Sequence, residues 1–520
     1  MKTTKTGKNG QNGTIWGVFM YKRSNRDQLK IEDFFLPFGG KLDANNRWVK
    51  LAEDTPWDRI EDFYLETMSE ETGRNAIPAR IAFGAICIWK SEGLSDEDVV
   101  RYIQENPYVQ YYLGLHEFRT EPLFDSSMMV HFRKRFPVEF IAKVNECICT
   151  GKWPEEMRNV DRNDDDHKGG GSGTQKEKDP EENPANVSNS GTLIIDATVA
   201  DADIKYPTDI DLLNQCREHL EEAINLLWPF VSHDRHKYPY SQNKARKAFL
   251  NISKSKKWTK KKLYIGIGQQ LDYIERATER LHQMQSIVTD WEDKLPGWLK
   301  DRLNVIPKVY LQQKEMHENG THKSDDRIVS LQQPHIRPIV RGKRPEPTEF
   351  GQKLHLSVVD GYTFIEQTSW NNFNEGKDLP AAVENYRRRY GCYPKAVLAD
   401  KLYQTRENRK YCKDRNIRIS GPKLGRPKAG QDPEEDQKQM YQDACDRNVI
   451  EGKNGTAKRR YGLSLICSKL DETSKTEAAL SILMMNAWKR VYEELLHFLF
   501  HILGFTSLQS FTLLLFPVFQ

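Results

Sequence analysis

The pattern of apolar and polar positions divides the chain into a helical first part and a second part in which strands and helices alternate. From residue 57 to about residue 153 apolar residues recur at helical spacing. Ile77-Pro78 predicts the start of one helix, Gly93-Leu94-Ser95-Asp96 predicts a turn and an N-cap, and residues 126–135 predict a helix rich in basic residues. This pattern is typical of a helix-turn-helix-like module, and equally of a helical bundle with a solvated basic face.

Two apolar runs that carry an aspartate predict buried strands. They are residues 192–199, which contain Asp196, and residues 395–400, which end at Asp400. A charge in such a place costs free energy unless something compensates it. A third acid, Glu451, follows the apolar pair Val449-Ile450. Because carboxylates from separate elements can together hold Mg²⁺, these three acids are the candidate metal ligands and catalytic residues.

The segments around these strands predict a mixed sheet with a helical insertion. Apolar stripes within residues 216–227 and 267–281 indicate two long helices packed together. Asp360-Gly361 lies between alternating segments and is a strong hairpin signal, so we assign Asp360 to a turn and not to metal. The order is strand, helical insertion, hairpin, helix, strand, helix, strand, helix. It favours an α/β domain of the ribonuclease H type.

The net charge is only +4, from 78 Lys and Arg against 74 Asp and Glu, so the distribution of charge along the chain is more informative than its net value. Residues 244–262 hold nine cations and no acid, with Trp258 within the tract and Tyr264 just after it. A charge run is commonly a solvated face, but this one favours phosphate contact. The candidate DNA-binding cations are Arg133, Arg135, Lys256, Lys257, Lys260, Lys261, Arg341, Lys343, Arg447, Lys458, Arg459 and Arg460.

The remaining composition excludes some classes of protein. The eight cysteines show no paired spacing, so neither a zinc site nor a disulfide framework is predicted, and reduced thiols in a cytosolic protein are expected. Residues 495–520 contain no Asp, Glu, Lys or Arg, and this uncharged stretch is long enough to cross a bilayer. His, Gly and Pro residues divide this stretch, so we predict a core-packing or oligomerising helix with an apolar tail, and no membrane partner.

The predicted domain layout is a polar N-terminal segment (1–56), a helical, helix-turn-helix-like DNA-binding domain (57–160), a disordered linker (161–190), the first part of the catalytic domain (191–210), a helical basic insertion (211–330), the remainder of the catalytic domain (331–490) and an apolar C-terminal helix and tail (491–520).

Several motifs together resemble the DDE transposases of bacterial insertion sequences, in the insertion sequence five group. The resemblance covers most of residues 57–490. It implies that Asp196, Asp400 and Glu451 are the catalytic triad, and that Arg447 and Lys458 are the Arg and Lys of the signature around the glutamate. The matching stretches are residues 193–198, 203–209, 337–343, 350–353, 359–362, 399–403, 421–427, 448–453 and 455–462.

This sequence departs from the family's pattern in two places. The tyrosine of the signature would fall at Ala444, and Tyr441 lies about one turn earlier. The second aspartate is followed by Lys401-Leu402-Tyr403 and not by a glycine-containing turn. Neither departure removes a predicted metal ligand.

The resemblance implies a transposase that binds the terminal inverted repeats of its element on double-stranded DNA. It would cleave DNA with Mg²⁺, for which Mn²⁺ is expected to substitute, and join the 3′-hydroxyl ends to target DNA. A homodimer on DNA and a cytoplasmic, nucleoid-associated location in a bacterium are expected. Two alternatives remain open: a ribonuclease H-fold endonuclease that does not join ends, and a non-catalytic DNA-binding protein descended from a transposase.

Overall fold

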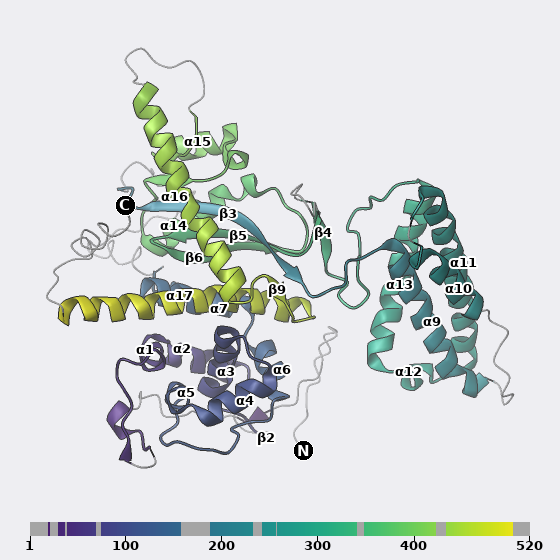
Figure 1. Cartoon of the computed structure of the whole chain (residues 1–520), viewed down its shortest axis with the longest axis horizontal. Helices are drawn as coiled ribbons and strands as arrows, with labels where there is room; N and C mark the ends of the chain where they lie inside the picture. The colour runs from purple at the N-terminus through teal and green to yellow at the C-terminus, as the bar shows by residue number, and fades with distance from the viewer. Residues whose placement is uncertain are drawn as a thin grey trace, which may run out of the picture. The chain divides into compact units, whose positions relative to one another are not determined.

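The computed structural model describes residues 19–20, 30–36, 39–68, 74–157, 188–231, 242–255, 257–340, 348–422 and 433–502. The chain forms two compact units, one of residues 1–154 with 483–520 and one of residues 155–482. Figure 1 shows the elements of both. The last helix, α17 (Asp471–Ile502), begins in the second unit and ends in the first.

The first unit consists mainly of helices, as predicted. Gly93, in the left-handed conformation, ends α3, and the Ser95 side chain accepts the Asp98 N–H to cap α4, so the predicted turn and cap are confirmed. The elements are β1 (Phe19–Met20), α1 (Arg47–Asp54), α2 (Trp57–Glu66), β2 (Arg74–Asn75), α3 (Ala79–Glu92), α4 (Asp96–Glu105), α5 (Pro107–Tyr112), α6 (Met128–Arg135), α7 (Val138–Thr150) and α8 (Pro154–Met157), which begins at the unit boundary. Helix α1 lies within the segment 1–56 that was predicted to be a polar N-terminal segment.

The end of α17 completes the core of this unit. The ring of Trp488 meets the ring of Trp48 edge-on, with centroids 5.1 Å apart. The Asn486 side-chain amide donates to Asn145 Oδ1 at 2.8 Å, and both residues are buried. No helix in the described ranges is long and apolar enough to cross a membrane. Residues 161–187 of the predicted linker and 503–520 of the predicted tail lie outside the described residues.

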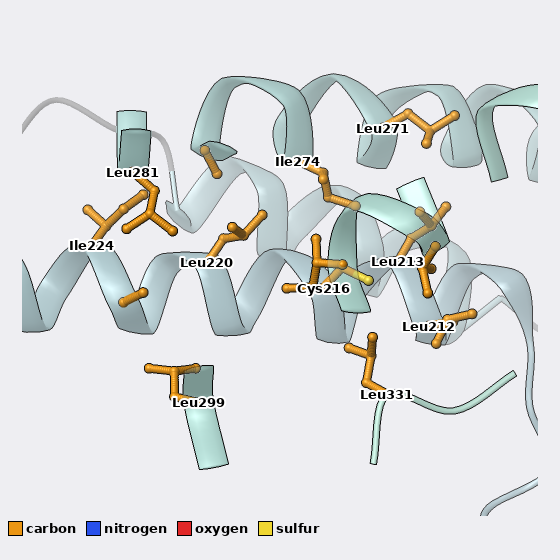
Figure 2. Packing of buried hydrophobic residues seen from close by; sticks show 14 of the residues in the cluster. Leu212, Leu213, Cys216, Leu220, Ile224, Leu271, Ile274, Leu281, Leu299 and Leu331 are labelled. Carbon is orange, nitrogen blue, oxygen red and sulfur yellow. The ribbon is translucent and has the colours of Figure 1, made fainter. Parts of the chain in front are cut away.

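The second unit contains a helical insertion with an apolar core. Its helices are α9 (Asp209–Val231), α10 (Gln242–Ser253), α11 (Lys260–Ile287), α12 (Trp291–Lys294) and α13 (Gly297–Glu318). The two predicted apolar stripes lie on α9 and α11, and Figure 2 shows side chains such as Leu220 and Ile274 packed between the helices. The prediction of two long helices was incomplete, because α13 is also long and α10 forms within the basic tract.

The rest of the second unit is a mixed sheet. The strand order is β4-β5-β3-β7-β8, with β6 paired to β5 and β9 paired to β3. Strand β3 is antiparallel to β5 and parallel to β7, and β7 is parallel to β8. The strands are β3 (Thr192–Ala202), β4 (Arg337–Val340), β5 (Thr348–Val359), β6 (Tyr362–Ser369), β7 (Ala396–Leu398), β8 (Arg418–Ile419) and β9 (Leu465–Ile466).

The predicted connections within the sheet are confirmed. Asp360 and Gly361 join β5 to β6 with φ values of 51° and 78°, the positive values that a tight hairpin turn requires. The flanking helices are α14 (Leu379–Tyr390), α15 (Arg406–Asp414) and α16 (Pro433–Arg460). Helix α14 contacts β3 and β6, and α16 packs against β3, β5 and β7.

Candidate active site

Asp196 lies on β3, between two neighbouring strands of the sheet. On one side it pairs with Leu356 of the antiparallel strand β5. On the other side β7 runs parallel, and its last paired residue, Leu398, lies opposite Ile194. Asp196 is half-buried between buried residues, so it is placed where β7 ends and no longer covers the edge of β3.

Asp400 lies at the end of that neighbouring strand. It is exposed, and its side chain accepts the Lys401 N–H at 2.6 Å, which caps the short 3₁₀ helix Lys401–Tyr403. Asp196 and Asp400 each follow a paired residue, Ile194 and Leu398, by two positions. In a parallel pair this register sets the two aspartates at the same level, just past the last paired residues, although β3 continues to Ala202.

Glu451 lies on α16. Ile450 is fully buried, whereas the Glu451 side chain is 57% exposed and its carboxylate lies 3.4 Å from Arg447 Nη2. Helix α16 packs against β3 and β7, the strands that precede or carry the two aspartates. Nevertheless, no group of three His, Cys, Asp or Glu side chains within the described residues is arranged to hold a metal ion. The structure therefore brings together the elements of the predicted triad but shows no three-acid cluster in the part of the chain that it describes.

A buried polar layer beside the two aspartates was missed by the sequence analysis. Burial raises the pKa of Tyr403 far above its usual value, and nearby carboxylates, including Asp196 and Asp400, raise this pKa further. The Tyr403 ring stacks on His355 of β5, with centroids 5.6 Å apart. Both residues are fully buried, and neither the Tyr403 hydroxyl nor the His355 ring nitrogens have a hydrogen-bond partner among the described residues. Burial lowers the pKa of His355.

Lysine and glutamate side chains of the same region are also buried but paired. Lys353 Nζ lies 2.7 Å from Glu375 Oε1. Glu366 and Arg389 form an ion pair with Oε1 and Nη1 2.5 Å apart, and their side chains are 2% and 3% exposed. The sequence carried a signal for this layer, since polar residues alternate at 353, 355 and 357 of β5. That signal is misleading, because such alternation usually marks a solvated strand face.

The two predicted DNA-binding arginines of α6 make contacts within the first unit. Arg133 donates from both terminal nitrogens to Asp96, at 2.7 and 2.8 Å, and its side chain is only 13% exposed. The Arg135 guanidinium lies 3.2 Å from the sulfur of Met68 and over the ring of Tyr64. Contact with phosphate by Arg133 would therefore compete with a bidentate ion pair.

The other predicted cations occupy two places in the second unit. Lys257, Lys260 and Lys261 are exposed at the start of α11. Lys458, Arg459 and Arg460 form the last turn of α16, where Arg459 and Arg460 are exposed. Lys256, Arg341 and Lys343 lie outside the described residues.

Two segments of the chain match transposase families. Residues 397–487 match the family described as "Transposase DDE domain", and residues 37–135 match "Transposase domain (DUF772)". The chain therefore contains a segment similar to a transposase DDE domain and another similar to a second transposase domain. The first match contains Asp400 and Glu451 and begins on β7, and the second covers α1 to α6 of the helical unit. Membership of the insertion sequence five group stays a prediction.

A curated relative of this chain was found in Rhizobium meliloti. It is named "Uncharacterized protein ORF8 in nfe locus" and is 32% identical over 133 residues. The match spans 24% of this chain and 64% of that protein. No solved structure matches the chain.

Proposed function

We propose that this protein is a DDE transposase that binds the terminal inverted repeats of an insertion sequence, cleaves the DNA with the aid of a divalent metal, and joins the 3′-hydroxyl ends to target DNA. The observation that carries the proposal is the parallel register of β3 and β7, in which Asp196 and Asp400 each lie two positions past the last paired residues. Asp400 also lies inside the matched DDE segment. The strand order, with β3 antiparallel to β5 and parallel to β7, is the order expected of a ribonuclease H-like domain.

The acids of this site suit a hard cation. Mg²⁺ prefers carboxylate oxygens and binds through few of them, which the pair of Asp196 and Asp400 supplies. Glu451 would add the third ligand from α16, which packs on the same strands. When bound, the metal would activate the attacking oxygen and stabilise the leaving oxygen of the phosphodiester. Mn²⁺ is expected to substitute for Mg²⁺, because it accepts the same oxygen ligands.

The cations of α16 have separate roles in this proposal. Arg447 holds the Glu451 carboxylate on the helix through their ion pair. Arg459 and Arg460, which are exposed about two turns after Glu451, would contact DNA phosphates beside the acids. Lys257, Lys260 and Lys261 would contact phosphates from the insertion.

The decisive experiment is Asp400→Asn in the full chain, assayed on DNA that carries the inverted repeats of the element. Cleavage should be abolished with either Mg²⁺ or Mn²⁺, while binding to the repeats is retained, because only the charge of a metal ligand is removed. Asp414→Asn, at an exposed position of α15, is the matched control and should cleave like the wild type. Loss of binding together with cleavage in Asp400→Asn would contradict the metal role.

A second candidate is a DNA-binding protein that no longer cleaves. The observation that favours it is that no three-acid metal cluster is formed among the residues described. A nicking assay of the wild type with Mg²⁺ and with Mn²⁺ decides between the two. If nicking occurs, pre-cut ends with a free 3′-hydroxyl show whether the protein also joins DNA or acts only as an endonuclease.

The DNA partners and the homodimer are proposals of the same kind. Because two ends of an element must be held together, we expect two copies of the chain in the complex with paired ends. Light scattering of the complex measures this directly. Affinity for the repeats should fall steeply with salt, since several phosphates are neutralised.

A further inference from the structure

The helical insertion contains a cavity that the proposed active site does not use. Its volume is about 410 Å³, within the range of pockets that bind small molecules. The first turns of α11, the end of α13 and the loop that follows α13 surround it. Leu263, Ile267 and Met316 form apolar walls, and Lys260 and Lys261 also line the cavity.

An aromatic pair forms one side of this cavity. The rings of Tyr264 and His317 stack with centroids 4.0 Å apart and planes 14° apart. His317 Nε2 also lies 3.0 Å from the Tyr264 carbonyl oxygen, which fixes the imidazole. Gly268 permits this arrangement, because a Cβ atom there would lie 3.2 Å from His317 Nε2. Tyr264 itself remains 50% exposed.

The acid that lines the cavity is already neutralised. Asp209 accepts from Arg327 Nη2 at 2.6 Å and from Gln313 Nε2 at 2.8 Å, and His322 Nδ1 lies 3.4 Å away. The charges left at the cavity are therefore those of Lys260 and Lys261, which favour an anionic ligand.

A second hollow on α11 extends this basic surface. It has a volume of about 370 Å³ and lies between α10 and α11. Lys244, Lys247 and Lys262 line it, and no acid does. Consecutive lysines at the start of α11 therefore line different hollows: Lys261 lines the first and Lys262 lines the second. A nucleic-acid backbone that followed these lysines would pass the mouth of the aromatic cavity.

We propose that the cavity receives a single nucleobase that has left the DNA stack, with the flanking phosphates on Lys260 and Lys261. A nucleobase matches the site, because its flat apolar faces suit the apolar walls and the exposed Tyr264 ring, while its phosphates suit the lysines. Extrusion from a paired duplex costs a few kcal/mol, and the cost is least for a base that is already unpaired. The inference rests on the DNA contact proposed above for the insertion, and it adds the form of DNA that the insertion prefers.

The test compares two duplexes of the same sequence, one fully paired and one with 2-aminopurine as a single bulged nucleotide. Binding of the full-length protein is measured in EDTA, so that no cleavage occurs. The wild type should bind the bulged duplex about tenfold more tightly, as expected for one base stacked on an aromatic ring. The fluorescence of the 2-aminopurine should fall on binding, because stacking on Tyr264 quenches it.

Substitutions in the cavity separate this proposal from general DNA binding. Tyr264→Ala should lose the preference for the bulge and keep its affinity for the paired duplex, whereas Tyr264→Phe should retain the preference because the ring remains. Trp258→Ala is the matched control, since Trp258 is 46% exposed on the same tract and lines neither hollow. Lys260→Gln with Lys261→Gln should weaken binding of both duplexes and flatten the salt dependence.

The outcomes are distinguishable from those for the catalytic proposal. Equal affinity of the wild type for both duplexes, or an unchanged preference in Tyr264→Ala, would overturn the nucleobase site even if Asp400-dependent cleavage is found. A preference that disappears only in Tyr264→Ala would support the site even if no cleavage is found. Failure to bind either duplex would overturn this inference together with the DNA contact on which it rests.

Discussion

The helical insertion and the sheet bury their residues by different rules. In the insertion, α9, α11 and α13 bury mainly Leu, Ile, Val, Ala and Met side chains in one apolar cluster, to which α9 adds the buried ion pair of Arg217 and Glu221. In the sheet, β5 buries Lys353, His355 and Ser357. The comparison shows that a polar alternation on a strand does not identify a solvated face when helices and loops cover both sides of the sheet.

The polar layer of the sheet is itself divided into paired and unpaired groups. Glu366 pairs with Arg389 and also accepts from Ser357 and from Asn385 Nδ2, the latter at 2.7 Å. Tyr403 and His355 have no hydrogen-bond partner among the residues described. We therefore expect substitutions in the two groups to change stability in opposite directions.

The largest effect is expected from breaking the buried ion pair. Arg389→Met leaves the Glu366 carboxylate buried without its cation, which should lower the free energy of unfolding by about 3–5 kcal/mol. Urea unfolding measures this. Lys410→Met, at an exposed position of α15, is the control and should change little. Adding Glu366→Gln to Arg389→Met should recover part of the loss; no recovery would mean that the charge is not the cause.

A smaller loss is expected in the apolar core of the insertion. Leu220→Ala removes a buried side chain between the helices and should cost about 2–5 kcal/mol. Leu226→Ala on the same helix is the matched control, because Leu226 is 38% exposed. Thermal unfolding of both variants tests whether the apolar stripe of α9 forms the buried face of the helix. Equal losses of stability would contradict this.

Removal of a buried hydroxyl without a hydrogen-bond partner should raise stability instead of lowering it. Tyr403→Phe keeps the stacked ring and removes a buried hydroxyl that has no partner in the described part of the chain, so stability should rise by about 1 kcal/mol. Tyr411→Phe is the comparison, because the Tyr411 hydroxyl donates to Glu384 and its removal should lower stability. A loss in both variants would show that Tyr403 Oη has a partner in solution.

The smallest effect is expected from pH. Burial lowers the pKa of His355, so the folded protein keeps the ring neutral at a pH where the unfolded chain takes up a proton. The neutral ring contributes its whole stabilisation when the pH is above about 6.5, the pKa of His in the unfolded chain. This stabilisation is lost as the pH falls from there towards the lower pKa in the folded protein.

Thermal unfolding between neutral pH and mildly acidic pH measures this loss. Burial also lowers the pKa of His335 and of His219, so the wild type is compared with His355→Leu. The slope should be shallower in the variant. His131→Leu, at an exposed position of α6, is the control, and a slope in His355→Leu as steep as the wild type would exclude this origin.

Features that depend on neighbouring residues could be predicted from the sequence. The cap at Ser95, the turn at Asp360-Gly361 and the left-handed Gly391 after α14 each follow from local chemistry. The apolar stripes of α9 and α11 could also be predicted, because their helical spacing indicates a single buried face on each helix.

Features that depend on the assembled fold could not be predicted. Helix α13 contains Pro307, a residue that is unfavourable inside a helix, so its length does not follow from local preference. The buried positions of Lys353 and His355 depend on cover from elements far along the chain. At the candidate site, Asp196, Asp400 and Glu451 were predicted from the sequence, and the register of β3 and β7 accounts for the positions of the two aspartates.

The course of α17 has a consequence for how the protein is made. Residues 483–502 supply Trp488 and Asn486 to the helical unit that begins the chain. During synthesis that unit must wait for almost the whole polypeptide to leave the ribosome before its interior can close. A fragment ending after α8 would expose the apolar surface that Trp488 covers, so the first unit should be expressed together with its distant helical segment, joined by a linker or supplied as a separate peptide.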